Sequence, residues 1–180
     1  RCVVCGKVET WLCESCLDRL SLLTEPICPK CGRLWKGPGL CAHCRNHPPL
    51  VESIRSPFLF QGPIQELIYA FKYRGAQDLA SLLAQCMAEF WRRFPEEVDV
   101  IVPVPLHPDR ERQRGYNQAA LLAEALGRLI ERPVALEALV RVRPTRSQTK
   151  LTATERRRNV ADAFACVRGE DMGGRDIMLV

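Results

Sequence analysis

Apolar residues recur every three or four positions in three stretches of the chain, a spacing that predicts amphipathic helices. In the first stretch, Ile64, Leu67 and Phe71 fall on one helical face. Pro63 suits the first turn of such a helix, and Gly75 suits its end. The pattern predicts helices over 62–75, 77–94 and 117–130.

Other stretches carry short runs of β-branched and apolar residues, which predict strands. The run 98–105 is almost continuously apolar, as is typical of a central parallel strand with both faces covered. Pro57 in the run 53–60 cannot donate a ladder hydrogen bond, so that strand is expected at an edge or a bulge. Further strands are predicted over 132–141 and 175–180. The order of these elements predicts an α/β fold with a parallel sheet and short helices on its faces.

Two long polar loops follow predicted strands, at 107–118 and 143–159. In parallel sheets, ligands bind beyond the carboxyl ends of the strands. Both loops are rich in Arg together with Gly, Ser or Thr, groups that bind anionic oxygens. The segment 141–158 holds seven cations and one anion, Glu155, in a chain whose formal net charge is +5. This cluster indicates either a site for phosphates or nucleic acid or a solvated helix face.

Eight of the ten cysteines lie within the first 44 residues as four Cys-x-x-Cys pairs. A unit with Gly after its first pair and Leu before its second pair occurs twice. Each unit supplies four thiolates, enough for one closed tetrahedral zinc site of the structural kind. Sequential pairing follows from the repeat, and an interleaved cross-brace is the alternative. The predicted ligands are Cys2, Cys5, Cys13 and Cys16 for one zinc, and Cys28, Cys31, Cys41 and Cys44 for the other.

Other interpretations of these cysteines are weaker. A disulfide framework suits secreted domains, and the sequence shows no leader with a cleavage site. A redox pair needs a βαβ setting, which four tandem copies lack. His43 is surplus, since eight thiolates already fill two sites. A segment so poor in large apolar residues has little core, so it needs a metal to hold it together.

The prolines of the segment 46–51 predict a hinge between a zinc-ribbon module at 1–47 and an α/β domain at 51–180. The composition is that of an ordinary globular protein, with 47% hydrophobic and 26% charged residues. No apolar run approaches the roughly 20 residues that span a bilayer. We therefore expect a cytoplasmic protein without membrane insertion.

The segments "DVIVPVPLHPDRERQRGYNQAALLAEAL" and "LVRVRPTRSQTKLTATERRRNVADAF" resemble the ComF family of bacterial competence proteins, and so does the helix "ELIYAFKYRG". The resemblance covers essentially the whole chain. It implies a type I phosphoribosyltransferase fold with an N-terminal cysteine-rich module. In this family a strand ending in Leu-Val leads into an Asp-Asp-x-x-Thr-Thr-Gly loop that binds phosphoribosyl pyrophosphate (PRPP). The resemblance thus implies that the chain is C-terminally incomplete, that it lacks this loop, which is expected after Val180, and that it is inactive as it stands.

The resemblance also implies PRPP-binding residues in the two polar loops, with Mg²⁺ accompanying PRPP. The loop 107–118 corresponds to the pyrophosphate loop of the family, and its arginines and backbone amides beside a helix N-terminus suit that role. The loop 143–159 corresponds to a mobile loop that closes over the site. The implied PRPP-binding residues are Arg112, Arg114, Gly115, Tyr116, Asn117, Thr145, Gln148, Lys150 and Arg156.

Several residues of these loops also have structural interpretations. Thr152 and Glu155 form the capping-box pattern of a short helix. His107 precedes Pro108, and positioning the turn suits it better than acting as a base. For Tyr116, stacking on a ligand and packing beneath the loop are equally consistent with the sequence.

The ComF resemblance implies a role in natural transformation, in which the protein handles incoming single-stranded DNA beside a helicase-like partner. It leaves open whether the phosphoribosyl group is transferred, and to which acceptor. One alternative is a non-catalytic adaptor that binds single-stranded nucleic acid through its zinc ribbons and basic loops. In that case Trp11 and Trp35 would stack on bases, whereas a structural role would pack both indoles against the ribbons. The other alternative is a nucleotide-salvage phosphoribosyltransferase unconnected with DNA.

Overall fold

A computed structural model describes residues 1–8, 10–24, 26–149, 151–167 and 172–180. The chain divides into two compact units, Arg1–Ala70 and Phe71–Val180. Within the described ranges, no helix is long and apolar enough to cross a membrane. The predicted domain ranges 1–47 and 51–180 stay a prediction.

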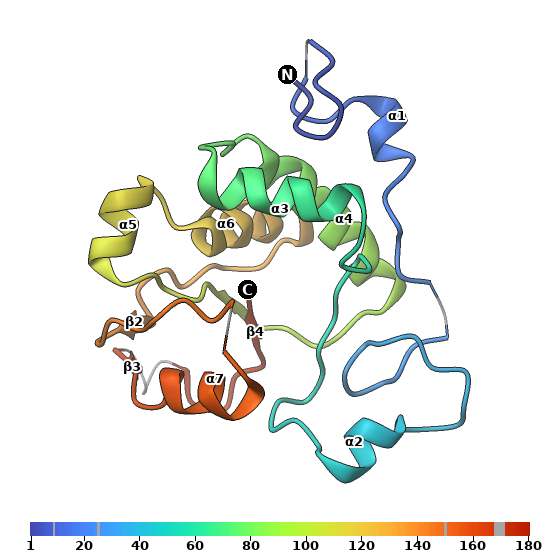
Figure 1. The fold of residues 1–180 in the computed structure, drawn as a ribbon. Helices are drawn as coiled ribbons and strands as arrows, with labels where there is room; N and C mark the ends of the chain where they lie inside the picture. Colours follow the sequence, from blue (N-terminus) through green and yellow to red (C-terminus); the bar gives the residue numbers. More distant parts are fainter. Residues whose placement is uncertain (9, 25, 150, 168–171) are drawn as a thin grey trace. The chain divides into compact units, whose positions relative to one another are not determined.

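In its described residues, the first unit consists of short helices and loops without an extended sheet. The strand predicted over 53–60 is wrong, because only Phe58 pairs, through an isolated antiparallel bridge to Leu22. Pro57 has no N–H to donate, which keeps this ladder from extending. The helices of this unit are α1 (Glu14–Leu17) and α2 (Ala42–Asn46), and helix α3 begins in it (Figure 1).

The three helices predicted from apolar spacing are confirmed, with slightly shorter bounds. Asn117 caps the third of them by accepting a hydrogen bond from the Ala119 N–H at 3.0 Å. Gly75, with a φ of 69°, follows the first as predicted. These helices are α3 (Pro63–Tyr73), α4 (Leu79–Arg93) and α6 (Gln118–Ile130).

Two further helices lie in the polar loops. Helix α5 (Pro108–Arg114) occupies most of the predicted loop 107–118, so the prediction of a loop is wrong there. The His107 side chain caps it by accepting a hydrogen bond from the Asp109 N–H at 3.3 Å, which confirms the turn-positioning role of His107. No residue of α5 is buried, so the apolar period that reveals the other helices is missing from its sequence. Helix α7 (Ala153–Val160) begins with the predicted capping box of Thr152 and Glu155.

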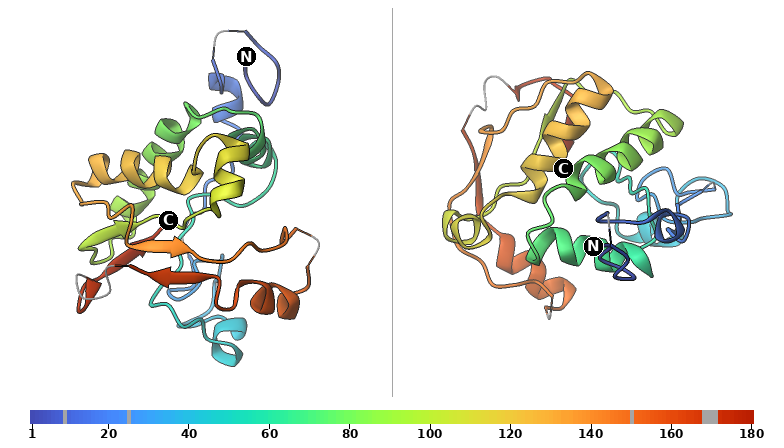
Figure 2. Two further views of the ribbon diagram at one scale, coloured as in Figure 1. Left: turned by 90° about the vertical axis from the view of Figure 1, so that its left-hand side faces the viewer. Right: turned by 90° about the horizontal axis from the view of Figure 1, so that it is seen from above.

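The strands form one parallel and one antiparallel pair, so the fold is mixed α/β (Figure 2). Strand β1 (Val100–Val102) pairs in parallel with β4 (Ile177–Leu179), as predicted for these two segments. Strand β2 (Leu139–Arg141) pairs antiparallel with β3 (Phe164–Cys166), a strand that the pattern did not predict. The prediction of a purely parallel sheet is therefore wrong.

The predicted strand 132–141 is divided by a turn, which explains the mixed pairing. Val134 makes a single parallel bridge to Ile101. The chain then turns, with the Ala138 N–H bonded to the Ala135 C=O at 3.5 Å, and β2 starts one residue later.

Helices α4 and α6 pack together over one face of β1 and β4 (Figures 1 and 2). Ile101 is fully buried there among small residues such as Ala88 and Ala123. Gly127 lets α6 approach closely, since a Cβ at this position would lie 2.6 Å from Val134 Cγ2. This packing fixes the carboxyl end of β1, which leads into α5.

Candidate functional site

Two clusters of four cysteines lie in the first unit. In each cluster the four Sγ atoms are within 4.8 Å of one another, close enough for one metal ion. The clusters follow the sequential grouping rather than the interleaved one, and His43 belongs to neither. Their members are Cys2, Cys5, Cys13 and Cys16, and Cys28, Cys31, Cys41 and Cys44.

The backbone repeats the same geometry around both clusters. Gly6 and Gly32 have φ values of 79° and 68°, which L-residues with a Cβ rarely adopt. A Cβ on Gly32 would also lie 2.4 Å from the Ile54 carbonyl oxygen. Cys13 and Cys41 are the N-cap residues of α1 and α2. The partly positive N-terminal end of each short helix therefore lies next to a thiol.

The thiols of each cluster differ in acidity. Burial alone would raise the pKa of Cys28, but backbone N–H groups, that of Cys41 first, lower it to about 6. The pKa of Cys2 is likewise about 6, because backbone N–H groups outweigh the effect of burial. Burial raises the pKa of Cys16 and of Cys44 to about 12. Four thiolates in such a space need a bound cation, and this donor set fits two structural zinc sites.

Trp35 packs against the second cluster. The Arg45 guanidinium lies over its ring, 5.7 Å from the centroid. A Cβ on Gly37 would lie 2.6 Å from the indole Cζ2. The indole is thus engaged in packing the ribbon, which supports the structural interpretation of Trp35 over base stacking.

A basic pocket of about 430 Å³ lies in the second unit. Among the described residues, three cations and no carboxylate line it. An uncompensated group of cations in a concave site favours an anionic ligand. We call it the basic pocket, and its lining is Lys72, Tyr73, Gly75, Arg110, Gln113, Arg114 and Ser147.

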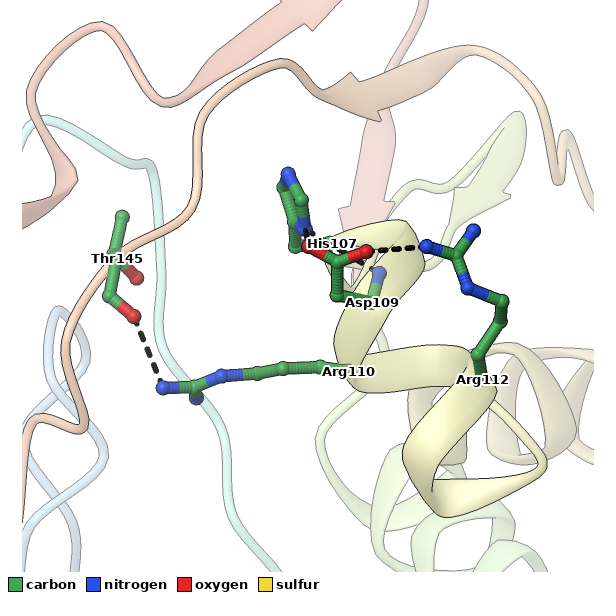
Figure 3. A network of polar contacts seen from close by, with 5 residues as sticks. All are labelled: His107, Asp109, Arg110, Arg112 and Thr145. Atoms are coloured by element: carbon green, nitrogen blue, oxygen red, sulfur yellow. Dashed lines mark hydrogen bonds and ion pairs between the residues drawn. The ribbon is translucent and has the colours of Figure 1, made fainter.

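The two faces of α5 separate its arginines. Arg110 and Arg114 are four residues apart, so they share a face, and both line the basic pocket. Arg110 also donates a hydrogen bond to the Thr145 carbonyl oxygen at 2.9 Å (Figure 3). Arg112 instead forms an ion pair with Asp109 (Figure 3). The structure thus brings the two predicted loops together through Arg110, and it brings Arg114 but not Arg112 to the pocket.

The other residues implied for the pyrophosphate loop have structural contacts. The Gly115 N–H bonds to the Glu111 C=O at 2.7 Å as α5 ends. Tyr116 is buried and donates its hydroxyl hydrogen bond to the Phe71 C=O. The Asn117 side chain caps α6 and donates to the Val104 C=O at 3.2 Å. Their roles toward PRPP stay a prediction.

Arg141, the last residue of β2, brings more positive charge close to Thr145. Arg141 donates to the Thr145 hydroxyl. Burial, together with repulsion from Arg110 and Arg143, lowers the pKa of Arg141. Guanidinium groups therefore crowd around Thr145, and a bound anion would relieve their repulsion.

Gln148 and Arg156 contact each other, because the Arg156 Nε–H donates to the Gln148 C=O at 3.2 Å. Neither residue lines the basic pocket. Their roles toward PRPP also stay a prediction. Lys150, the remaining implied residue, lies outside the described residues.

Sequence analysis missed the pocket residues Arg110, Lys72, Gln113 and Ser147. The signal for Arg110 was present: Pro108 at a helix start, acidic residues in the first turn and Gly115 at the end predict a helix. In a helix, Arg110 and Arg114 must share a face. Lys72 and Ser147 come from distant segments, so no local pattern places them in one site.

Gln118 is a further residue that the sequence did not single out. Its side chain is buried at 7% exposure, and its Nε2 has no hydrogen-bond partner in the part of the chain that the structure describes. It is the first residue of α6, directly after the Asn117 side chain that bonds to the end of β1. Buried amides are normally paired, so this donor is unusual, although Gln118 does not line the basic pocket.

The chain matches known proteins along most of its length. Residues 1–45 match the family described as a double zinc ribbon domain, which confirms the predicted ribbons. The chain is 30% identical to competence protein ComFC of Bacillus subtilis, over 97% of this chain and 72% of that protein. It is 30% identical to competence protein F of Haemophilus influenzae, over 92% of this chain and 76% of that protein.

A third relative carries a different description. The chain is 31% identical to DNA utilization protein YhgH of Escherichia coli K12, over 85% of this chain and 70% of that protein. No solved structure matches the chain significantly.

Proposed function

The chain belongs to the ComF family of competence proteins, and on this basis we propose that it acts in DNA uptake as a phosphoribosyltransferase-like protein that binds PRPP. The relatives are described as competence and DNA utilization proteins. In this role the protein handles incoming single-stranded DNA in the cytoplasm, beside a helicase-like partner, with its zinc ribbons as a structural module.

The observation that carries PRPP binding is the basic pocket. PRPP bears a diphosphate and a 5-phosphate, and the pocket offers guanidinium and ammonium groups without a lining carboxylate among the described residues. Its volume of about 430 Å³ suits a small, highly charged ligand. The pocket also lies between the two loops to which the family resemblance assigns this ligand.

The chemistry of phosphoribosyl transfer matches these groups. Breaking the C1–O bond of PRPP releases diphosphate while positive charge develops on the ribose, as in glycoside hydrolysis. Arg110, Arg114 and Lys72 would bind the diphosphate oxygens and stabilise the leaving group. Because no carboxylate of the described residues lines the pocket, Mg²⁺ would be held there by the diphosphate oxygens themselves.

Calorimetric titration tests this proposal. We expect saturable binding of diphosphate and of PRPP in the presence of Mg²⁺, and much weaker binding of ribose 5-phosphate, which lacks the diphosphate. The contrast follows from the number of anionic oxygens that each ligand offers to the pocket. Absence of diphosphate binding, or equal binding of ribose 5-phosphate, would overturn the proposal.

Gln118→Leu gives a second, independent test. The melting temperature should stay the same or rise, because an unpaired buried amide costs about 1–3 kcal/mol. The affinity for PRPP should stay unchanged, because Gln118 does not line the basic pocket. Calorimetry and thermal unfolding measure the two effects. A several-fold loss of PRPP affinity at unchanged stability would show that the ligand extends beyond the basic pocket to Gln118.

A further inference from the structure

Helix α7 has no buried residue, so apolar packing does not explain its stability. A helix that is polar on all sides needs other interactions to form. The capping box supplies one set, in which the Thr152 hydroxyl accepts from the Glu155 N–H at 3.3 Å and Glu155 Oε2 accepts from the Thr152 N–H at 2.7 Å.

Polar contacts with the preceding loop supply the rest. The Asn159 side chain accepts from the Arg146 N–H at 3.1 Å and donates to the Arg146 C=O at 2.9 Å. Arg143 donates to the C=O groups of Asn159 and Ala161, at the C-terminal end of the helix. Arg156 donates to the Gln148 C=O at 3.2 Å. These bonds join the loop 143–149 and α7 into one structural element.

The arginines of this element fall into two groups. Arg143 and Arg156 donate to main-chain carbonyl groups and stabilise the element itself. Arg146, Arg157 and Arg158 are exposed, and in the described part of the chain their guanidinium groups have no hydrogen bond or ion pair. Because the Arg146 backbone is bonded to Asn159, all three lie at the last turn of α7. We call Arg146, Arg157 and Arg158 the arginine surface.

The three cations of this surface outnumber the nearest acidic residues along the chain, which are Glu155 and the exposed Asp162. Glu155, the one acidic residue of α7, is held in the capping box, and hydrogen bonds from Thr152 lower its pKa. The helix dipole places only about half a negative charge at the C-terminal end, where Arg143 adds a fourth cation. Three exposed cations without an ion pair in the described part of the chain leave their charge available to an external anion.

We propose that the arginine surface binds the phosphate backbone of single-stranded nucleic acid. The proposal rests on the proposed function in DNA uptake and adds the surface on which a strand would lie. The three arginines stand on an exposed helix and line neither of the two described cavities, which suits an extended polyanion better than a compact one. The helix has no apolar face to insert into a membrane, so a lipid surface fits it less well.

The test measures the fluorescence anisotropy of a fluorescein-labelled oligo(dT) of about 30 nucleotides over a range of salt concentrations. This strand is longer than the roughly 4–16 nucleotides that one single-strand-binding domain covers. Each phosphate contact on a single strand contributes about 0.7 to the slope of log affinity against log salt. We expect the triple variant Arg146→Ala, Arg157→Ala, Arg158→Ala to bind more weakly, with a slope reduced by about 2. The matching Arg→Lys triple variant should keep most of the slope, since it keeps the charges.

A charge-matched control separates this surface from the zinc ribbons. The variant Lys7→Ala, Arg33→Ala, Lys36→Ala removes the same three charges from exposed positions of the ribbons and should leave the slope almost unchanged. Equal binding by the Ala triple variant and the wild type, or an equal loss in the ribbon variant, would overturn the proposal. Binding to phosphatidylserine vesicles but not to oligo(dT) would overturn it in favour of a membrane. The Ala triple variant should bind diphosphate with the same affinity as the wild type. This titration therefore tests the basic pocket separately from the arginine surface.

Discussion

Cys28→Ser is expected to release one of two zinc ions per chain and to unfold the second ribbon locally. Cys28 is fully buried, its Sγ accepts a hydrogen bond from the Cys41 N–H at 3.4 Å, and its pKa is about 6, so it is a ready thiolate ligand. Structural zinc contributes about 10–16 kcal/mol to the folding of zinc-finger peptides, and a ribbon without a core has no other comparable source. Elemental analysis would give the zinc content, and hydrogen exchange of residues 28–44 would give the extent of unfolding.

Cys166→Ser is the matched control, because it makes the same chemical change at an exposed thiol outside both clusters. It should keep two zinc ions and normal exchange protection in the ribbons. Two zinc ions retained by the Cys28 variant would mean that the ligand assignment is wrong. Loss of both ions would mean that the two ribbons fold as one unit.

The zinc sites could be predicted from the sequence because the information is local. Two residues separate the thiols of each pair, and Gly6 and Gly32 mark the turns by a backbone conformation that other residues rarely adopt. The sequential grouping also followed, since the repeat places each group of four within a short segment. Short chain separations leave few alternative arrangements.

The sheet could be predicted only in part, because strand pairing depends on distant segments. The apolar runs around Ile101 and Met178 identified the parallel pair β1 and β4. Strand β3 is short and half exposed, so its residues give no clear period. The direction of β2 is set by its pairing with β3. Because the sequence pattern did not reveal β3, the antiparallel pair was not predicted.

Helix α5 shows how a missed element misplaces a functional residue. Treated as a loop, its sequence offers Arg112 and Arg114 beside the backbone amides of a helix N-terminus, and only the family resemblance pointed to these two arginines. Treated as a helix, the same sequence pairs Arg114 with Arg110 and turns Arg112 toward Asp109. Which arginines line the basic pocket therefore depends on secondary structure that has no apolar signal.

The double variant Arg110→Ala, Arg114→Ala is expected to lose diphosphate and PRPP binding almost completely. A hydrogen bond to a charged group is worth about 1.5–3 kcal/mol, so two such losses lower the affinity about 100-fold or more. Stability should change little through Arg114, whose guanidinium lies over the Tyr73 ring, 5.2 Å from its centroid. Arg110 also bonds to the Thr145 C=O, so its loss should increase hydrogen exchange near that residue. Calorimetry and exchange measured on the same samples give both effects.

Arg112→Ala is the control that decides between the two arginine assignments. Arg112 lies on the same helix, and its substitution removes one positive charge where the double variant removes two. Its guanidinium is paired with Asp109 on an exposed surface, where such pairs contribute about 0–1 kcal/mol. We therefore expect nearly unchanged affinity and melting temperature. If Arg112→Ala lost binding while the double variant kept it, ligand binding would require α5 to rearrange, and the loop-like arrangement suggested by the sequence would be the active one. The opposite result would show that the helical arrangement is the one that binds the anion.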